Sequence, residues 1–130
     1  MNDDPRRLRV LLTRAQNLAL GHNVPSVVMG LAAEEGDLIF PDFVSFLQSG
    51  LRVEDGIFRM TRERVVVHMA DLDRTRAQDV LDRLIADFCE EFPAAERPAF
   101  EALFFEVKPG SSPVRVRDVL TEIFAARTLH

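Results

Sequence analysis

The sequence predicts an α/β (α+β) domain: a ferredoxin-like β-α-β-β-α-β antiparallel sheet with one extra helix at each end of the chain. Two observations predict this fold. The apolar residues change between helical and strand spacing in the order that this topology requires. The first and third predicted strands are also apolar on both faces, and in this topology those two strands lie in the middle of the sheet.

The length and composition fit a single domain over residues 1–130. The chain has 130 residues, 47% of them hydrophobic and 10 of them Phe, which is enough for a real core. Its net charge of -5 argues against a nucleic-acid binder, because such a protein needs a basic surface. The one cysteine, Cys89, excludes an internal disulfide and a cysteine-based zinc cluster.

The chain shows no membrane or secretory signature. No apolar run approaches the roughly 18 residues that a membrane helix needs. The first five residues, Met-Asn-Asp-Asp-Pro, lack the basic and apolar segments of a secretory signal. We therefore expect a cytoplasmic protein that does not contact a membrane.

The first part of the chain predicts a helix, a strand and a second helix. Asp4 is a suitable cap for a helix over residues 5–21, since Pro5 then takes the first helical position. Residues 26–33 form a short, nearly all-apolar run, which is typical of a buried strand. Residues 40–51 carry apolar side chains at helical spacing. The core of the domain therefore begins at about residue 25.

The middle of the chain predicts a hairpin. Residues 56–60 and 64–69 have the composition of strands, and a tight polar connection at 61–63 joins them. The second of these strands contains three consecutive valines, so both of its faces are apolar. We expect it to be one of the two central strands.

The last part of the chain predicts a long helix, a strand and a final helix. Asp71 or Asp73 is a suitable cap for the long helix, and Pro93 ends it. Residues 100–107 predict the fourth strand, and residues 116–127 predict the last helix. The core therefore extends to about residue 127.

Three motifs follow one another between residues 52 and 84: an Arg-x-x-Asp pair, a five-residue hairpin, and an apolar strand that leads into a capped helix. In this order and at this spacing they resemble a GGDEF domain, the diguanylate cyclase family, whose hairpin reads Gly-Gly-Asp/Glu-Glu-Phe. The resemblance extends more weakly over residues 26–127, and it implies a nucleotidyl-cyclase-like fold. The matching residues are Arg52-Val53-Glu54-Asp55, then Gly56-Ile57-Phe58-Arg59-Met60, then Thr61-Arg62-Glu63-Arg64-Val65, then Val66-Val67-His68-Met69-Ala70-Asp71.

The hairpin departs from the family pattern. The two glycines of the family let the nucleotide approach the backbone, because glycine has no Cβ. Thr61 and Arg62 replace both glycines here. Glu63 keeps the first acid, Arg64 reverses the charge of the second, and Val65 takes the place of the Phe. The resemblance is therefore to a degenerate member of the family.

The predicted first strand also lacks the family's metal ligands. The family places Asp residues at the end of this strand to bind two magnesium ions, which need oxygen ligands. Here residues 29–33 are Met, Gly, Leu, Ala and Ala, and the first carboxylate is Glu34. The family's guanine-recognising Phe-Lys-x-x-Asn-Asp segment has no counterpart between Glu34 and Phe43. We therefore expect no catalytic residues, no metal site, no cofactor and no enzyme activity.

The resemblance leaves three functions open for this chain in bacterial signalling. The first is a catalytically inactive domain that binds another protein or a second copy of itself. The second is a receptor for cyclic-di-GMP that uses Arg52 and Asp55, since Arg pairs with phosphate or stacks on guanine and Asp accepts hydrogen bonds from guanine. An ordinary surface ion pair is the plain alternative for these two residues. The third is a divergent enzyme of the same fold.

Other features allow both a structural and a functional interpretation. Arg59, Arg62 and Arg64 lie around the predicted hairpin, where alternation suggests that Arg62 and Arg64 share a face and form an anion or acidic-partner site. A solvated hairpin tip is the alternative. His68 is expected to be a hydrogen-bonded buried histidine, and Cys89 a small core residue.

Two surfaces are candidates for a partner. The helix over residues 5–21 is amphipathic, and it either packs on its own sheet or mediates a homodimer. Three Phe residues of the fourth predicted strand would add a partner surface if one face of the sheet were uncovered. They are Phe100, Phe104 and Phe105.

Overall fold

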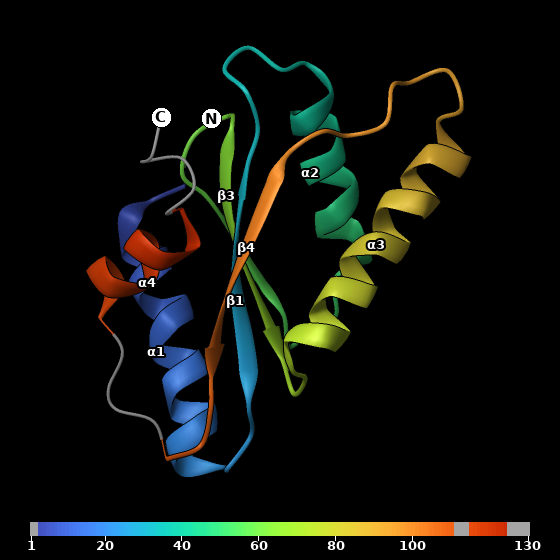
Figure 1. The fold of residues 1–130 in the computed structure, drawn as a ribbon. Helices are drawn as coiled ribbons and strands as arrows, with labels where there is room; N and C mark the ends of the chain where they lie inside the picture. The colour runs from blue at the N-terminus through green and yellow to red at the C-terminus, as the bar shows by residue number, and fades with distance from the viewer. Residues whose placement is uncertain (1–2, 111–114, 125–130) are drawn as a thin grey trace.

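The computed structural model describes residues 3–110 and 115–124. Four strands form one antiparallel sheet, in the order β2-β3-β1-β4 (Figure 1). This order confirms the ferredoxin-like arrangement, with the first and third strands in the middle. The strands are β1 (Ser26–Ala32), β2 (Gly56–Arg59), β3 (Arg64–Ala70) and β4 (Glu101–Val107).

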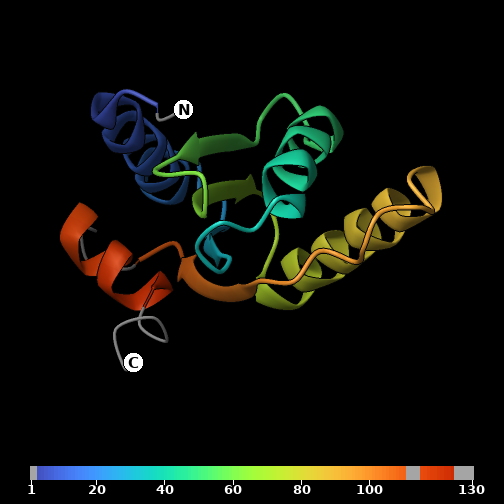
Figure 2. The ribbon, with the colours of Figure 1, turned by 90° about the horizontal axis from the view of Figure 1, so that it is seen from above.

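Helices cover both faces of the sheet, which gives three layers. Figure 2 shows α2 and α3 on one side, and α1 and α4 on the other. The predicted residues 125–127 of the last helix and 111–113 of the loop before it lie outside the described residues. The helices are α1 (Pro5–Gly21), α2 (Ile39–Gly50), α3 (Arg74–Glu91) and α4 (Val116–Ile123).

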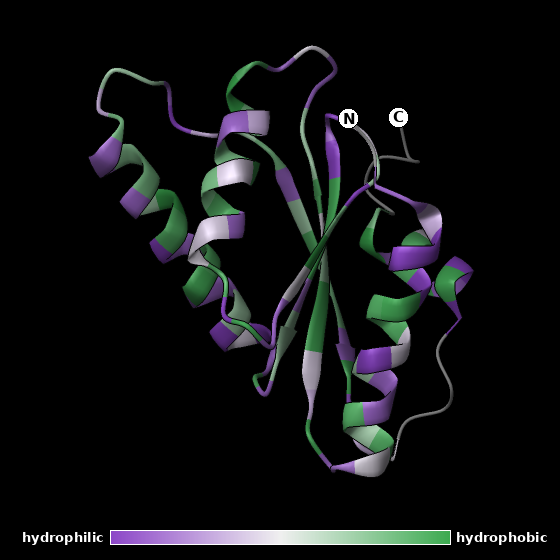
Figure 3. Ribbon diagram, turned by 180° about the vertical axis from the view of Figure 1, so that it is seen from behind, coloured by the Kyte–Doolittle hydropathy of each residue, from purple (hydrophilic) through white to green (hydrophobic). Residues whose placement is uncertain are grey.

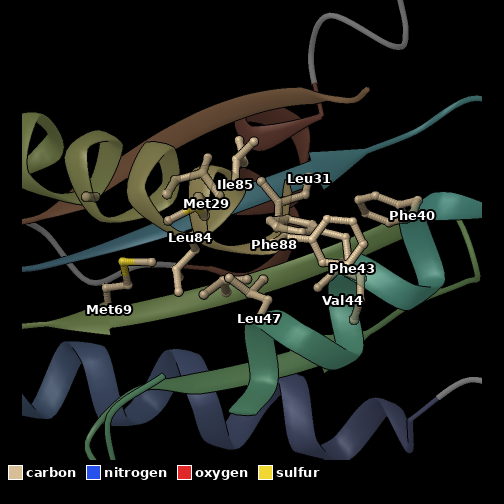
Figure 4. Close-up of a cluster of buried hydrophobic side chains, with 14 of the residues drawn as sticks. Met29, Leu31, Phe40, Phe43, Val44, Leu47, Met69, Leu84, Ile85 and Phe88 are labelled. Atoms are coloured by element: carbon tan, nitrogen blue, oxygen red, sulfur yellow. The ribbon is translucent and has the colours of Figure 1, made fainter. Parts of the chain in front are cut away.

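Strand alternation divides the core into two clusters. Val65 and Val67 of β3 point to the layer of α2 and α3, whereas Val66 points to the layer of α1 and α4. In the first cluster, side chains of α2 meet those of β1 and α3 (Figure 4). The rings of Phe43 and Phe88 make an edge contact there, with centroids 5.6 Å apart. The buried triple valine therefore stabilises both layers at once.

Acidic side chains cap the first three helices. Asp4 accepts a hydrogen bond from the Arg6 amide (3.0 Å), and Asp73 accepts one from the Arg76 amide (2.9 Å). These caps confirm Asp4 and decide between Asp71 and Asp73. A third cap was not predicted: the Asp37 carboxylate accepts hydrogen bonds from the first two amides of α2, at 2.8 and 2.9 Å.

The N-terminal helix packs on its own sheet. Its buried residues, among them Leu8, Leu12 and Ala15, form part of the second cluster. Figure 3 shows the hydrophobic and hydrophilic residues alternating along this helix, as expected for one face on the sheet and one in water. This confirms the packing alternative, and the homodimer stays a prediction.

The fourth strand is covered on both faces. Phe100 and Phe104 pack against the cluster of α2 and α3, and Phe105 packs against the cluster of α1 and α4. Helix α4 approaches closely because Gly30 has no side chain: a Cβ there would lie 2.6 Å from the carbonyl oxygen of Ile123. The predicted Phe-rich partner surface required an uncovered face of the sheet, and β4 has none.

None of the helices within residues 3–110 and 115–124 has both the length and the apolar character of a membrane span.

Candidate functional site

The Arg52–Asp55 pair lies in the loop between α2 and β2 and contacts the end of β3. The Asp55 side chain is only 4% exposed. Its carboxylate accepts hydrogen bonds from the amide, Nε and Nη2 of Arg52, at 3.1, 3.1 and 3.0 Å, and from the Ala70 amide at 3.0 Å. The pair therefore joins the start of β2 to the last residue of β3.

Arg52 is held from several sides but stays half exposed. Its Nη2 also donates to the Ala70 carbonyl oxygen, and its Nε lies 3.2 Å from Glu54 Oε1. The hydrogen bonds to Asp55 raise the pKa of Arg52 above its usual value. Among the described residues, Nη1 makes no hydrogen bond, and the side chain is 47% exposed. The guanidinium thus has a fixed position with one edge free.

The side chain of Thr61 stabilises the turn of the hairpin. The Thr61 hydroxyl oxygen accepts hydrogen bonds from the amides of Glu63 (3.2 Å) and Arg64 (3.0 Å). The Glu63 carbonyl oxygen accepts one from the Ala33 amide (2.8 Å), and its carboxylate accepts one from the Gly36 amide (3.4 Å). Both contacts tie the turn to the end of β1, so Glu63 is used within the fold.

A cavity of about 240 Å³ lies between α2 and the hairpin. Thr61, Arg62 and Val65 form one wall of the cavity, and Arg59 lies beside them. The Nη2 of Arg59 donates a hydrogen bond to Gln48 Oε1 at 2.6 Å. The other wall is formed by Pro41, Val44 and Ser45 of α2. All seven lining residues are neutral or cationic.

The prediction that Arg62 and Arg64 share a face is wrong. Arg62 lines the cavity on the α2 side, whereas the guanidinium of Arg64 lies 5.3 Å from the ring centre of Phe124, on the α4 side. Strand alternation does not reach Arg62, because β3 begins only at Arg64 and Arg62 belongs to the turn. The arginines near the cavity are therefore Arg59 and Arg62.

His68 takes the buried position that was predicted, with one difference, and Cys89 lies at the edge of the core. His68 is 1% exposed, and its Nε2 has no hydrogen-bond partner among the residues that the structure describes. The predicted hydrogen bond is therefore missing at that atom. Burial lowers the pKa of His68 to about 4; Asp55 opposes this effect and Arg14 adds to it. Cys89 is half-buried against the cluster of α2 and α3.

The fold was compared with families, curated proteins and solved structures. No family model and no curated protein matches the chain. The GGDEF domain of FimX from Pseudomonas aeruginosa superposes with a TM-score of 0.71 at 12% identity, over 96% of this chain and 90% of that chain. This chain has a GGDEF-like fold. The GGDEF domain of DgcB from Caulobacter crescentus, in complex with c-di-GMP, gives 0.66 at 13% identity, over 93% and 80%.

A GGDEF-like fold also occurs in PelD. PelD from Pseudomonas aeruginosa PA14, in complex with c-di-GMP, superposes with a TM-score of 0.68 at 21% identity over 94% of this chain. This chain spans only 45% of the length of that PelD chain. The shared part is therefore the domain alone.

The positions that carry chemistry in GGDEF domains are filled differently in this GGDEF-like chain. Thr61 and Arg62, which the family resemblance aligns with the hairpin glycines, line the cavity beside α2. The end of β1 is apolar and buried, up to Ala32 and Ala33. Within the described residues, no three His, Cys, Asp or Glu side chains lie close enough to hold a metal ion.

Proposed function

We propose that this chain is a catalytically inactive GGDEF-like domain that regulates signalling in the bacterial cytoplasm by binding another protein or a second copy of itself. The observation that carries the proposal is the cavity beside the hairpin. Two bulky side chains, Thr61 and Arg62, line it where the family has glycines. A nucleotide cannot approach this backbone as closely as it approaches glycine.

A second feature supports inactivity independently of the hairpin. Phosphoryl transfer depends on bound metal ions to neutralise the developing charge. The end of β1, where the family resemblance implies metal-binding acids, holds the buried side chains of Leu31, Ala32 and Ala33. These side chains offer no oxygen ligand for magnesium.

The test is turnover of GTP by the purified chain. We expect no cyclic dinucleotide after incubation with GTP and either Mg²⁺ or Mn²⁺, as measured by liquid chromatography. The double variant Thr61→Gly/Arg62→Gly should stay inactive too, because β1 still lacks the acids. An active diguanylate cyclase in the same buffer is the positive control. Metal-dependent product from the unmodified chain would overturn the proposal.

A second candidate function is a receptor for cyclic-di-GMP, and the Arg52 guanidinium favours it. Asp55 and the Ala70 carbonyl fix this group in place, and one edge stays open to solvent. Fixing a binding group in advance reduces the entropy that binding costs. The DgcB and PelD domains, each in complex with c-di-GMP, support this candidate through their shared fold.

Calorimetry with cyclic-di-GMP tests the receptor function. We expect saturable heat with the unmodified chain, and affinity at least about tenfold weaker for Arg52→Ala, since hydrogen bonds to charged groups are lost. Arg52→Lys should also bind more weakly, because Lys cannot pair with two acceptors at once. Arg83→Ala, which removes an exposed arginine of α3, is the matched control. No heat at high micromolar ligand, or equal binding by Arg52→Ala, removes this candidate.

A further inference from the structure

A second cavity, of about 230 Å³, lies between α1 and the start of β2. Helix α1 contributes Arg7, Val10, Leu11 and Arg14 to its walls, and the sheet contributes Gly56 and His68. Arg52 does not line it, so this cavity is separate from the Arg-x-x-Asp pair. It is also on the opposite face of the sheet from the cavity beside the hairpin, which α2 lines.

The walls of this cavity carry unbalanced positive charge. Arg7 and Arg14 are two helical turns apart and therefore lie on the same side of α1. Arg7 has a distant partner in Asp3, with 3.8 Å between Nη1 and Oδ1. Arg14 makes no hydrogen bond or ion pair with any described residue. Helix α1 contains no acidic residue of its own, although the whole chain is acidic.

The base of the cavity is formed by His68, one polar atom of which has no partner among the described residues. His68 comes from the middle of β3, and the alternation of that strand turns its ring toward α1. Its Nε2 is buried and makes no hydrogen bond within residues 3–110 and 115–124. Buried polar groups almost always have a partner, so the fold leaves an unsatisfied polar group next to this cavity.

The remaining wall of the cavity is apolar. Val10 is 68% exposed, and Leu11 packs on Gly56, where a Cβ would lie 3.3 Å from Leu11 Cδ1. A cavity of about 230 Å³ has room for several water molecules. It therefore suits a ligand with one charged end and a short apolar end.

We propose that this cavity binds a small organic anion, a carboxylate or a phosphate on a short apolar body, between Arg7 and Arg14 with His68 at its base. The charged end pairs with the guanidinium of Arg14, which has no ion-pair partner in the part of the chain that the structure describes. The apolar end lies against Val10 and Leu11, over the imidazole ring of His68. This site is independent of the function proposed above.

Titration of the ¹⁵N-labelled chain with benzoate and with phenyl phosphate tests the site. These probes share an apolar body and differ in the charged group, so they separate a carboxylate site from a phosphate site. We expect saturable shifts of the Gly56 and His68 amide signals with at least one probe. The side-chain nitrogen signals of His68 should shift as well, which a contact at the helix surface alone does not produce.

Two arginine variants provide the control. Arg14→Ala should weaken probe binding by about tenfold or more, because a charge-assisted contact is lost. Arg9→Ala removes the same charge from the same helix but lies outside the cavity, and it should bind like the unmodified chain. Both arginines are exposed, so both variants should fold. Equal weakening in the two variants, or shifts that rise linearly without saturation, overturns the proposal.

Discussion

Replacing Asp55 by Ala is expected to lower the free energy of unfolding by about 3 kcal/mol. The nearly buried carboxylate accepts hydrogen bonds from three donors of Arg52 and from the Ala70 amide. The variant removes all of them at once. It also leaves the Ala70 amide without a partner at the end of a central strand, and an unmet buried amide costs more than a lost surface contact. Chemical denaturation followed by circular dichroism measures the effect.

Glu54→Ala is the matched control for this prediction. Glu54 also pairs with Arg52, with 3.2 Å between Glu54 Oε1 and Arg52 Nε, but both side chains are about half exposed. An exposed ion pair contributes little, so Glu54→Ala should change the free energy of unfolding by less than about 1 kcal/mol. If Asp55→Ala costs as little as Glu54→Ala, Asp55 does not hold the two strands together.

The structural role of Asp55 affects how the receptor function is tested. A carboxylate with four internal donors is already satisfied, so its replacement reports on folding first. Arg52 differs, because half of its side chain meets solvent. Loss of ligand binding in Arg52→Ala, together with an intact fold, is therefore the more specific observation. In the sequence, Arg52 and Asp55 belong to one Arg-x-x-Asp motif, and the motif alone does not distinguish their roles.

The fold could be predicted from the sequence because its signals are local. The triple valine at 65–67 is apolar on both faces, and that requires a central strand with helices on both sides. Asp4 and Asp73 lie directly before their helices, so their caps could be recognised by position. Asp37 caps α2 from two residues before the helix, where the pattern gave no comparable signal.

The sites could be predicted less well because they depend on contacts between distant elements. The side on which Arg62 lies follows from the turn geometry that Thr61 creates, and strand alternation does not describe it. The cavity over His68 forms only when α1 lies on the sheet beside Gly56. No spacing in the sequence links Arg14 to His68, so this site could not be found before the fold was known.

The stability of the chain is expected to fall as the pH drops from about 6.5 to about 4, through protonation of His68. Burial lowers the pKa of His68 from 6.5 to about 4, so in this range the unfolded chain binds a proton that the folded chain does not. The free energy of unfolding therefore rises with pH across this window. One pKa unit corresponds to about 1.4 kcal/mol, so the total loss is about 3 kcal/mol.

Burial decides the sign of this effect, and the charged groups that face His68 modify it. Arg14 on α1 disfavours a positive charge on the ring and Asp55 favours one, but burial is the largest cause. Denaturation curves at several pH values should be compared for the unmodified chain and His68→Leu, which keeps the side chain buried and removes its titration. The carboxylates titrate in both proteins, so the difference between the two slopes isolates His68. Parallel slopes between pH 4 and 6.5 would show that His68 is protonated as easily in the folded chain as in the unfolded one.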